Sequence, residues 1–136
     1  MEDCIFCKIV EGKIPAAKIY ENENVVSFLD IMPANKGHCL VVPKQHAQTL
    51  IEMGEEDLIA TIKAAKRVAR ALSLTFGNGS FNLVMNNGKE AGQLVSHAHI
   101  HIIPRFQKDR LRIKWSHLKY GENEINEYAE KIRKFI

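Results

Sequence analysis

The chain has 136 residues, 46% of them hydrophobic, which is enough to bury a core as one domain. Its formal net charge of +3 is a mild basic excess that favours anionic ligands without the dense basic patch of a nucleic-acid-binding protein. No apolar run approaches the roughly 20 residues of a membrane span, and residues 1–13 carry charges where a secretory signal needs an apolar core. We therefore expect a cytoplasmic protein that binds neither nucleic acid nor a membrane.

Short strands make up most of the predicted secondary structure. Apolar or alternating runs bounded by turn residues indicate strands at 17–21, 24–30, 37–44, 80–86 and 96–105. The sequence NEN joins the first two strands as a hairpin, and a short helix is expected around CIFCKIV, residues 4–10. Because several adjacent strands are linked by short turns, the pattern predicts an α+β fold with a mainly antiparallel, five-stranded sheet.

The clearest helix is predicted over residues 55–76. Acidic residues open this segment and Gly77 ends it, as suits the helix dipole and a helix stop. Its apolar positions step by three and four: Leu58, Ile62, Ala65, Ala69, Leu72 and Phe76. Residues 123–136 show the same spacing and predict a C-terminal helix. We expect a single domain over 1–136, with an N-terminal segment at 1–12, the long helix packed centrally on the sheet, and a tail at 106–136.

Three of the six histidines lie at alternate positions of SHAHIHIIPR, residues 96–105. Because side chains alternate faces along a strand, His97, His99 and His101 would share one face, with successive members about 6.6 Å apart. The opposite face would carry apolar residues suited to a core. Such a row can consist of partnered surface histidines, of metal ligands, or of a nucleophile with neighbouring donors.

The loop NGKEAGQ, residues 87–93, favours phosphate chemistry. Gly88 and Gly92 allow backbone amides to approach a phosphate closely, and Asn86 and Gln93 add side-chain amides. A phosphate held beside an imidazole indicates phosphoryl or nucleotidyl transfer. A metallohydrolase that uses the histidine row as its metal site remains an open alternative at this point.

Three motifs resemble one known family. HAHIHII (97–103), FLDIMPANKGHCLVVPKQH (28–46) and MNNGKEAGQ (85–93) are similar to the histidine triad (HIT) superfamily, in the Hint-like branch of nucleoside phosphoramidate hydrolases. The resemblance covers roughly residues 4–105 in order. It implies the HIT-like fold and an enzyme that acts at the α-phosphate of purine nucleoside phosphoramidates, of the AMP-amine type, through a covalent nucleotidyl-histidine.

The resemblance also implies a role for each matched residue. His99 would be the nucleophile, His101 and His38 would stabilise the phosphate, and His97 would begin the triad. Nucleotide contacts would come from Asp30 at the ribose, from Ile31, Phe6 and Phe28 at the base, and from Asn86, Gly92 and Gln93 at the phosphate or leaving group.

One position departs from the family pattern. The family often has Ser or Thr after the Gly-Gln pair, where this chain has Leu94. Without that hydroxyl, protonation of an amine leaving group is in question, so a dinucleoside polyphosphate hydrolase is the alternative enzyme. A nucleotide-binding module with incidental activity is the alternative outside the enzymes.

Cys4 and Cys7 form a C-x-x-C pair whose spacing lets both sulfurs reach one ion. The alternative is a pair of reduced core cysteines. Zinc-binding bacterial and archaeal members of the family use two such cysteines and two histidines, and the matching histidines here are His46 and His97. The resemblance therefore implies one structural zinc per chain and no catalytic metal.

The family also implies a homodimer, because its members pair through the long helix and a sheet edge. The sequence adds that the apolar strand at 80–86 would make a poor exposed edge. If the C-terminal segment of each protomer reaches its partner's site, Trp115 would shape the leaving-group pocket.

Overall fold

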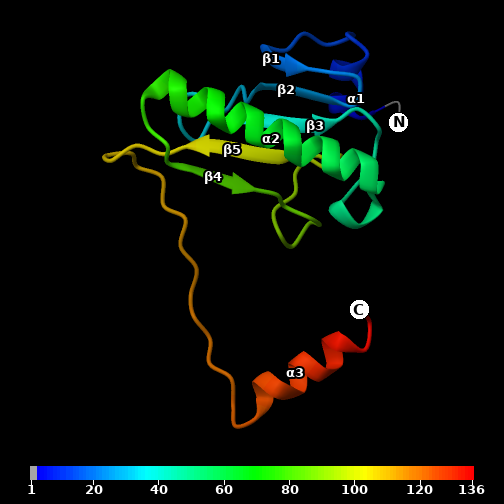
Figure 1. The fold of residues 1–136 in the computed structure, drawn as a ribbon, viewed down its shortest axis with the longest axis vertical. Coiled ribbons are helices and arrows are strands. Elements are labelled where there is room, and N and C mark those ends of the chain that lie inside the picture. The colour runs from blue at the N-terminus through cyan, green and yellow to red at the C-terminus, as the bar shows by residue number, and fades with distance from the viewer. Residues whose placement is uncertain (1–2) are drawn as a thin grey trace.

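The computed structural model describes residues 3–136, so Met1 and Glu2 of the N-terminal segment lie outside the described residues. In chain order the elements are α1 (Ile5–Val10), β1 (Lys18–Glu21), β2 (Val25–Leu29), β3 (Cys39–Pro43), a short 3-10 turn η1 (Leu50–Glu52), α2 (Glu55–Phe76), β4 (Phe81–Val84), β5 (Ile100–Pro104) and α3 (Glu124–Arg133). The five strands form one sheet in the order β1-β2-β3-β5-β4, and every neighbouring pair is antiparallel (Figure 1). The predicted fold class is confirmed.

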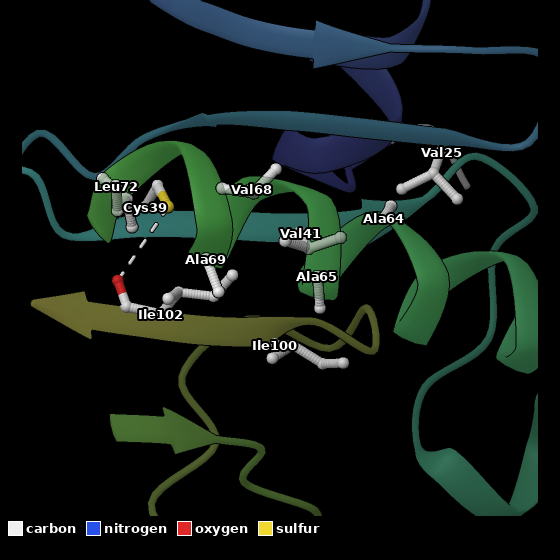
Figure 2. Packing of buried hydrophobic residues seen from close by; sticks show 10 residues of the cluster. All are labelled: Val25, Cys39, Val41, Ala64, Ala65, Val68, Ala69, Leu72, Ile100 and Ile102. Atoms are coloured by element: carbon white, nitrogen blue, oxygen red, sulfur yellow. Dashed lines mark hydrogen bonds between the residues drawn. The ribbon is translucent and has the colours of Figure 1, made fainter. Parts of the chain in front are cut away.

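Helix α2 covers one face of the sheet and closes the main core (Figure 2). Its buried side chains are mostly small: Thr61, Ala64, Ala65, Val68, Ala69 and Leu72. They pack on Val25, Cys39, Val41, Ile100 and Ile102 of three adjacent strands. Small side chains let the helix lie close to the sheet, and the Thr61 hydroxyl is satisfied because it donates to the Asp57 carbonyl at 2.6 Å.

The predicted bounds of this helix are correct, but two positions of its predicted apolar stripe are wrong. Ile62 is 46% exposed and Phe76 is 39% exposed. The buried ridge runs instead through Thr61, Ala64 and Val68, which turns Ile62 to the outside. Phe76 lies at the end of the helix, where its ring meets that of Phe106 edge-on at 5.3 Å.

A second apolar layer covers the opposite face of the sheet and ties down the N-terminal segment. Its buried members are Phe6 and Ile9 of α1 with Val26, Phe28, Leu40 and Val42 of β2 and β3. Neighbouring residues of β3 therefore face different layers, with Val41 toward α2 and Leu40 toward α1. This packing places α1 beside the histidine-bearing end of β5.

Strand β5 is shorter than predicted, so of the three histidines only His101 lies within it. In the pairing with β3, Leu40 is opposite His101 and Val41 is opposite Ile100. The ladder stops there because the end of β3 is Pro43, which has no backbone N–H to donate. The preceding segment pairs elsewhere, with the Ala98 amide donating to the Ala47 carbonyl at 2.7 Å.

The C-terminal tail forms an arm that leaves the sheet. Figure 1 shows residues 106–122 running past the β4 edge to α3, which stands apart from the sheet. Helix α3 has no buried residue, and its apolar side chains Ile125, Tyr128 and Ile132 are about half exposed or more. No helix within residues 3–136 combines the length and apolar character needed to cross a bilayer.

Candidate functional site

The candidate site is built where β3 and β5 lie side by side. His38 directly precedes β3, and His101 lies in β5, so the pairing of these strands brings their rings together. Nε2 of His38 is 2.9 Å from Nδ1 of His101. The Asp30 carboxylate, at the end of β2, lies 3.7 Å from Nε2 of His38. One residue of β5 and two residues that flank β2 and β3 thus form one polar cluster on the face away from α2.

His99 is buried between this cluster and α1. Its ring lies 4.9 Å from the His101 ring and 5.1 Å from the Phe6 ring, centroid to centroid. Nδ1 of His99 is 2.6 Å from the His97 carbonyl, which can only accept, so this nitrogen carries the proton. In the neutral ring, Nε2 then has a free lone pair, and it has no hydrogen-bond partner among residues 3–136.

Burial favours the neutral form of all three rings. Burial lowers the pKa of His99 and of His38 below the usual 6.5, although the Asp30 carboxylate opposes this in both cases. Burial, with the neighbouring His99 and His38, lowers the pKa of His101 to about 4. A neutral imidazole with a free nitrogen is the form that can act as a nucleophile.

The glycine-rich loop after β4 is braced internally. Gly88 and Gly92 both have positive φ values, 91° and 88°, which only glycine adopts without strain. The Gln93 side chain accepts from the Gly88 amide at 2.8 Å and donates to the carbonyls of Gln48 and Val95. Both amide hydrogens of Gln93 are therefore used inside the protein. The Asn86 amide lies beside Gly92 and is only partly buried.

The residues expected around a nucleotide base differ in exposure. Phe6 and Phe28 are buried, and their rings meet edge-on at 5.6 Å. Ile31 is 93% exposed. Leu94 is likewise 94% exposed. It lines a hollow of about 680 Å³ between the N-terminal residues and the segments around His46 and Val95.

A second cluster brings together Cys4, Cys7, His46 and His97, whose four ligand atoms all lie within 4.8 Å of one another. Sγ of Cys4 is 3.3 Å and Sγ of Cys7 is 3.6 Å from Nδ1 of His97. Nδ1 of His46 is 3.4 Å from the Cys7 sulfur and 3.2 Å from Nδ1 of His97. A tetrahedron with metal–sulfur bonds of about 2.3 Å and metal–nitrogen bonds of about 2.1 Å has edges of roughly 3.3–3.8 Å, so the cluster could hold a metal ion.

The donor chemistry of this cluster fits a cation. Nε2 of His97 is 2.7 Å from the Pro43 carbonyl and must donate to it, which leaves the lone pair of Nδ1 for a ligand. Without a metal, burial and the neighbouring Cys4 raise the pKa of the Cys7 thiol to about 11. Metal binding would therefore release a proton from this thiol.

Sequence reasoning missed the groups that orient the rings. The Ala34 amide donates to Nδ1 of His38 at 3.0 Å, and the carbonyls of Pro43 and His97 orient two other rings. All three of these groups are backbone atoms that carry no residue-type signal. His97 contacts both parts of the site: its side chain lies in the cysteine cluster, and its carbonyl accepts from Nδ1 of His99.

Residues 11–108 match the HIT domain family, and the chain belongs to that family. It is 39% identical over 130 residues to the adenosine 5′-monophosphoramidase hnt1 of Schizosaccharomyces pombe, and the aligned region covers 95% of each chain. A crystal structure from Streptococcus mutans superposes with a TM-score of 0.93 at 41% identity, over 98% of this chain and 85% of that one. A Zn-bound histidine triad family protein from Mycobacterium smegmatis has a TM-score of 0.78 at 38% identity, over 85% and 84%. The predicted family and fold are confirmed.

Proposed function

We propose that the protein is a nucleotidyl hydrolase or transferase that acts at the α-phosphate of purine nucleoside phosphoramidates through a covalent intermediate on His99. The observation that carries the proposal is the state of the His99 ring. Its Nδ1–H is bound to the His97 carbonyl, so the neutral ring presents a free Nε2 beside His101. The relative named as an adenosine 5′-monophosphoramidase supports a hydrolase of this type.

The reaction proceeds in two displacements. Nε2 of His99 forms a bond to the α-phosphorus while the bond from phosphorus to the leaving-group nitrogen breaks. The departing amine takes a proton from water, since Leu94 offers no hydroxyl at the position where the family often has one. Water then attacks the phosphorus, the bond to His99 breaks, and the nucleotide leaves with the ring neutral again.

The other site residues bind and stabilise the nucleotide in this proposal. Asp30 holds the ribose hydroxyls, and Ile31 closes over the base with Phe6 and Phe28 beneath it. His38 and His101 stabilise charge on the phosphate. The amides of the 87–93 loop, with Asn86, Gly92 and Gln93, lie against the leaving group, where Gln93 acts by bracing the loop.

We propose further that Cys4, Cys7, His46 and His97 hold one structural zinc per chain. The near-tetrahedral spacing of the four donors supports this, as does the Zn-bound relative. Four protein ligands leave no open position for substrate, so the metal's part is to pin α1 to the segment that carries His99. No catalytic metal is required.

Leu94 favours a second candidate, a dinucleoside polyphosphate hydrolase. A polyphosphate is a good leaving group without a proton, so it depends less on a hydroxyl at that position. A steady-state comparison of adenosine 5′-phosphoramidate, an adenylated lysine and a diadenosine polyphosphate separates the two. We expect the two phosphoramidates to have the higher kcat/KM. A kcat/KM at least tenfold higher for the diadenosine compound would instead assign the protein as a dinucleoside polyphosphate hydrolase.

We also propose a homodimer. Within the described chain, β4 is an edge strand that pairs only with β5, and its side chains Phe81 and Leu83 are 41% and 44% exposed. The outer face of α2 adds the exposed Ile62, and the arm past β4 carries the exposed Trp115. The S. mutans structure matches 98% of this chain, arm included, which supports an arm held by contacts outside its own chain.

Light scattering at micromolar concentration should therefore give about twice the chain mass of 15.4 kDa. Leu83→Arg should shift the mass toward the monomer, because a charge in the buried edge would be desolvated without a partner. Ile51→Arg is the matched control, since Ile51 is 92% exposed in η1 and belongs to neither β4 nor α2. A wild-type mass near 15.4 kDa would contradict the dimer.

A further inference from the structure

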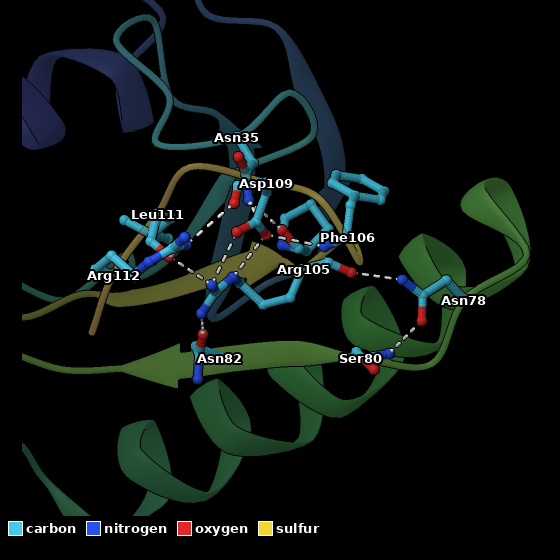
Figure 3. A network of polar contacts seen from close by, with 10 residues as sticks. Asn35, Asn78, Ser80, Asn82, Arg105, Phe106, Asp109, Leu111 and Arg112 are labelled. Carbon is cyan, nitrogen blue, oxygen red and sulfur yellow. Dashed lines mark hydrogen bonds and ion pairs between the residues drawn. The ribbon is translucent and has the colours of Figure 1, made fainter. Parts of the chain in front are cut away.

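A network of polar side chains joins the base of the arm to the turn that carries His38 (Figure 3). The Asn35 side-chain amide donates to the Pro104 carbonyl and to Oδ2 of Asp109, both at 2.9 Å. Arg105 binds both oxygens of the same carboxylate, through Nε at 2.8 Å and Nη2 at 2.9 Å. The Asp109 side chain is 6% exposed, so this bidentate pair is shielded from water.

Asn35 lies within a turn whose geometry is tightly specified. The backbone amide of His38 donates to the Asn35 carbonyl at 3.0 Å, and the Asp30 amide donates to the His38 carbonyl at 3.0 Å. Gly37 has a φ of +94°, and a Cβ there would come within 2.6 Å of the Phe76 ring. The turn therefore packs as one piece. The Asn35 side chain attaches it to the arm base and to Pro104, and the contact of His38 with His101 attaches it further along β5.

The turn sets the hydrogen position on two rings. The Ala34 amide can only donate, so Nδ1 of His38 accepts, and the neutral ring carries its proton on Nε2. That proton is donated to Nδ1 of His101 at 2.9 Å. The neutral His101 ring must then carry its own proton on Nε2, which has no hydrogen-bond partner among the described residues. The result is an N–H donor at the far nitrogen of His101.

We propose that Asn35 is a positioning residue that holds the 30–38 turn in place. In that turn the Ala34 amide selects the tautomer of His38 that is protonated on Nε2. This tautomer in turn makes Nε2 of His101 a hydrogen-bond donor to the α-phosphate. The inference rests on the proposed function, because it assigns a phosphate to the free nitrogen of His101. The opposite tautomers would turn a lone pair toward the anionic phosphate, which is repulsive. Asp109 and Arg105 act only through Asn35.

The network contains its own control. Asn82 of β4 accepts from Nη1 of Arg105 at 2.8 Å, so it belongs to the same network and does not contact the turn. Asn35→Ala should lower kcat by roughly 10–100-fold with little change in KM, because the displaced donor acts on the transition state. Asn35→Asp should lower kcat at least as much, since it removes the amide donor and places a second negative charge beside Asp109. Asn82→Ala should keep kcat within about twofold.

The ring nitrogens provide a measurement that stability alone would not change. In protein labelled with ¹⁵N-histidine, NMR distinguishes protonated from unprotonated ring nitrogens, and His38→Gln assigns the His38 signals. We expect His38 of the wild type to carry its proton on Nε2, and Asn35→Ala to show a mixture of tautomers while Asn82→Ala does not.

Two results would overturn the inference: a wild-type His38 protonated on Nδ1, or equal losses of kcat in Asn35→Ala and Asn82→Ala. A wild-type His38 protonated on Nδ1 would overturn the inference even if a variant does not fold, and Asn35→Asp then provides a second variant for the role of Asn35. If the spectrum is as expected but His99→Ala turns over normally, the proposed nucleophile fails and the tautomer assignment stands.

Discussion

His99→Ala should leave essentially no turnover while nucleotide binding survives. The variant removes the only atom proposed to bond to phosphorus, whereas Asp30 and the glycine-rich loop remain. Loss of one preorganised donor typically lowers a rate by about 10²–10³. His101→Ala and His38→Ala should therefore keep measurable activity, and the gap between these variants and His99→Ala separates the nucleophile from its supporting donors.

Trapping of the intermediate tests the same assignment directly. Wild-type protein mixed with a labelled nucleoside phosphoramidate and quenched during the first turnover should carry the label on the His99 peptide. The quench must be alkaline or detergent-based, because the nitrogen–phosphorus bond is labile in acid. His99→Gly should carry none. Normal turnover by His99→Ala, or label on another residue, would contradict the mechanism and return the histidines to the metallohydrolase interpretation.

Protein purified without added metal should contain about one zinc per chain, and Cys4→Ala should lose it. The four ligand atoms lie within 4.8 Å of one another, and α1 reaches the sheet through this cluster and through Phe6 and Ile9. Loss of the metal should cost about 3 kcal/mol of unfolding free energy, or roughly 10 °C in Tm for a domain of this size. The rate constant of the folded fraction should change much less.

Cys39 provides a matched control for this experiment. It is a free cysteine buried among the α2-facing residues and is not part of the metal cluster, so Cys39→Ala can lower Tm through lost packing alone. A strong chelator should lower the Tm of wild type and of Cys39→Ala but leave Cys4→Ala unchanged. A fully folded, active wild type that contains no zinc would remove the assignment.

The local elements of this protein are determined by local sequence. The helix predicted at 55–76 is observed as Glu55–Phe76, because an acidic start, a 3.6-residue apolar period and Gly77 are all signals between near neighbours. The five strands were likewise predictable from apolar runs between turn residues. The resemblance to the family also implied that Cys4, Cys7, His46 and His97 form one cluster, which the structure brings together.

The length of β5 and the buried face of α2 required the tertiary structure. Strand β5 cannot extend back to His97 because its neighbour β3 ends at Pro43. Strand β3 lies more than 50 residues earlier in the chain, so local sequence does not show this limit. Ile62 has the period of a core residue, yet it is exposed because the packed ridge of α2 lies beside it. Periodicity specifies that a helix has an apolar side; the sheet beneath selects which residues of that side are covered.

The chemistry of the rings was also decided by tertiary structure alone. The sequence contains six histidines, and nothing in it indicates which nitrogen of each ring carries a proton. The carbonyls of His97 and Pro43 and the amide of Ala34 decide this through contacts with His99, His97 and His38. Backbone groups are the same at every residue, so their effect depends only on where folding places them. For that reason the sequence by itself determined the family, the elements and the candidate residues, and only the packed chain decided which imidazole is free to react.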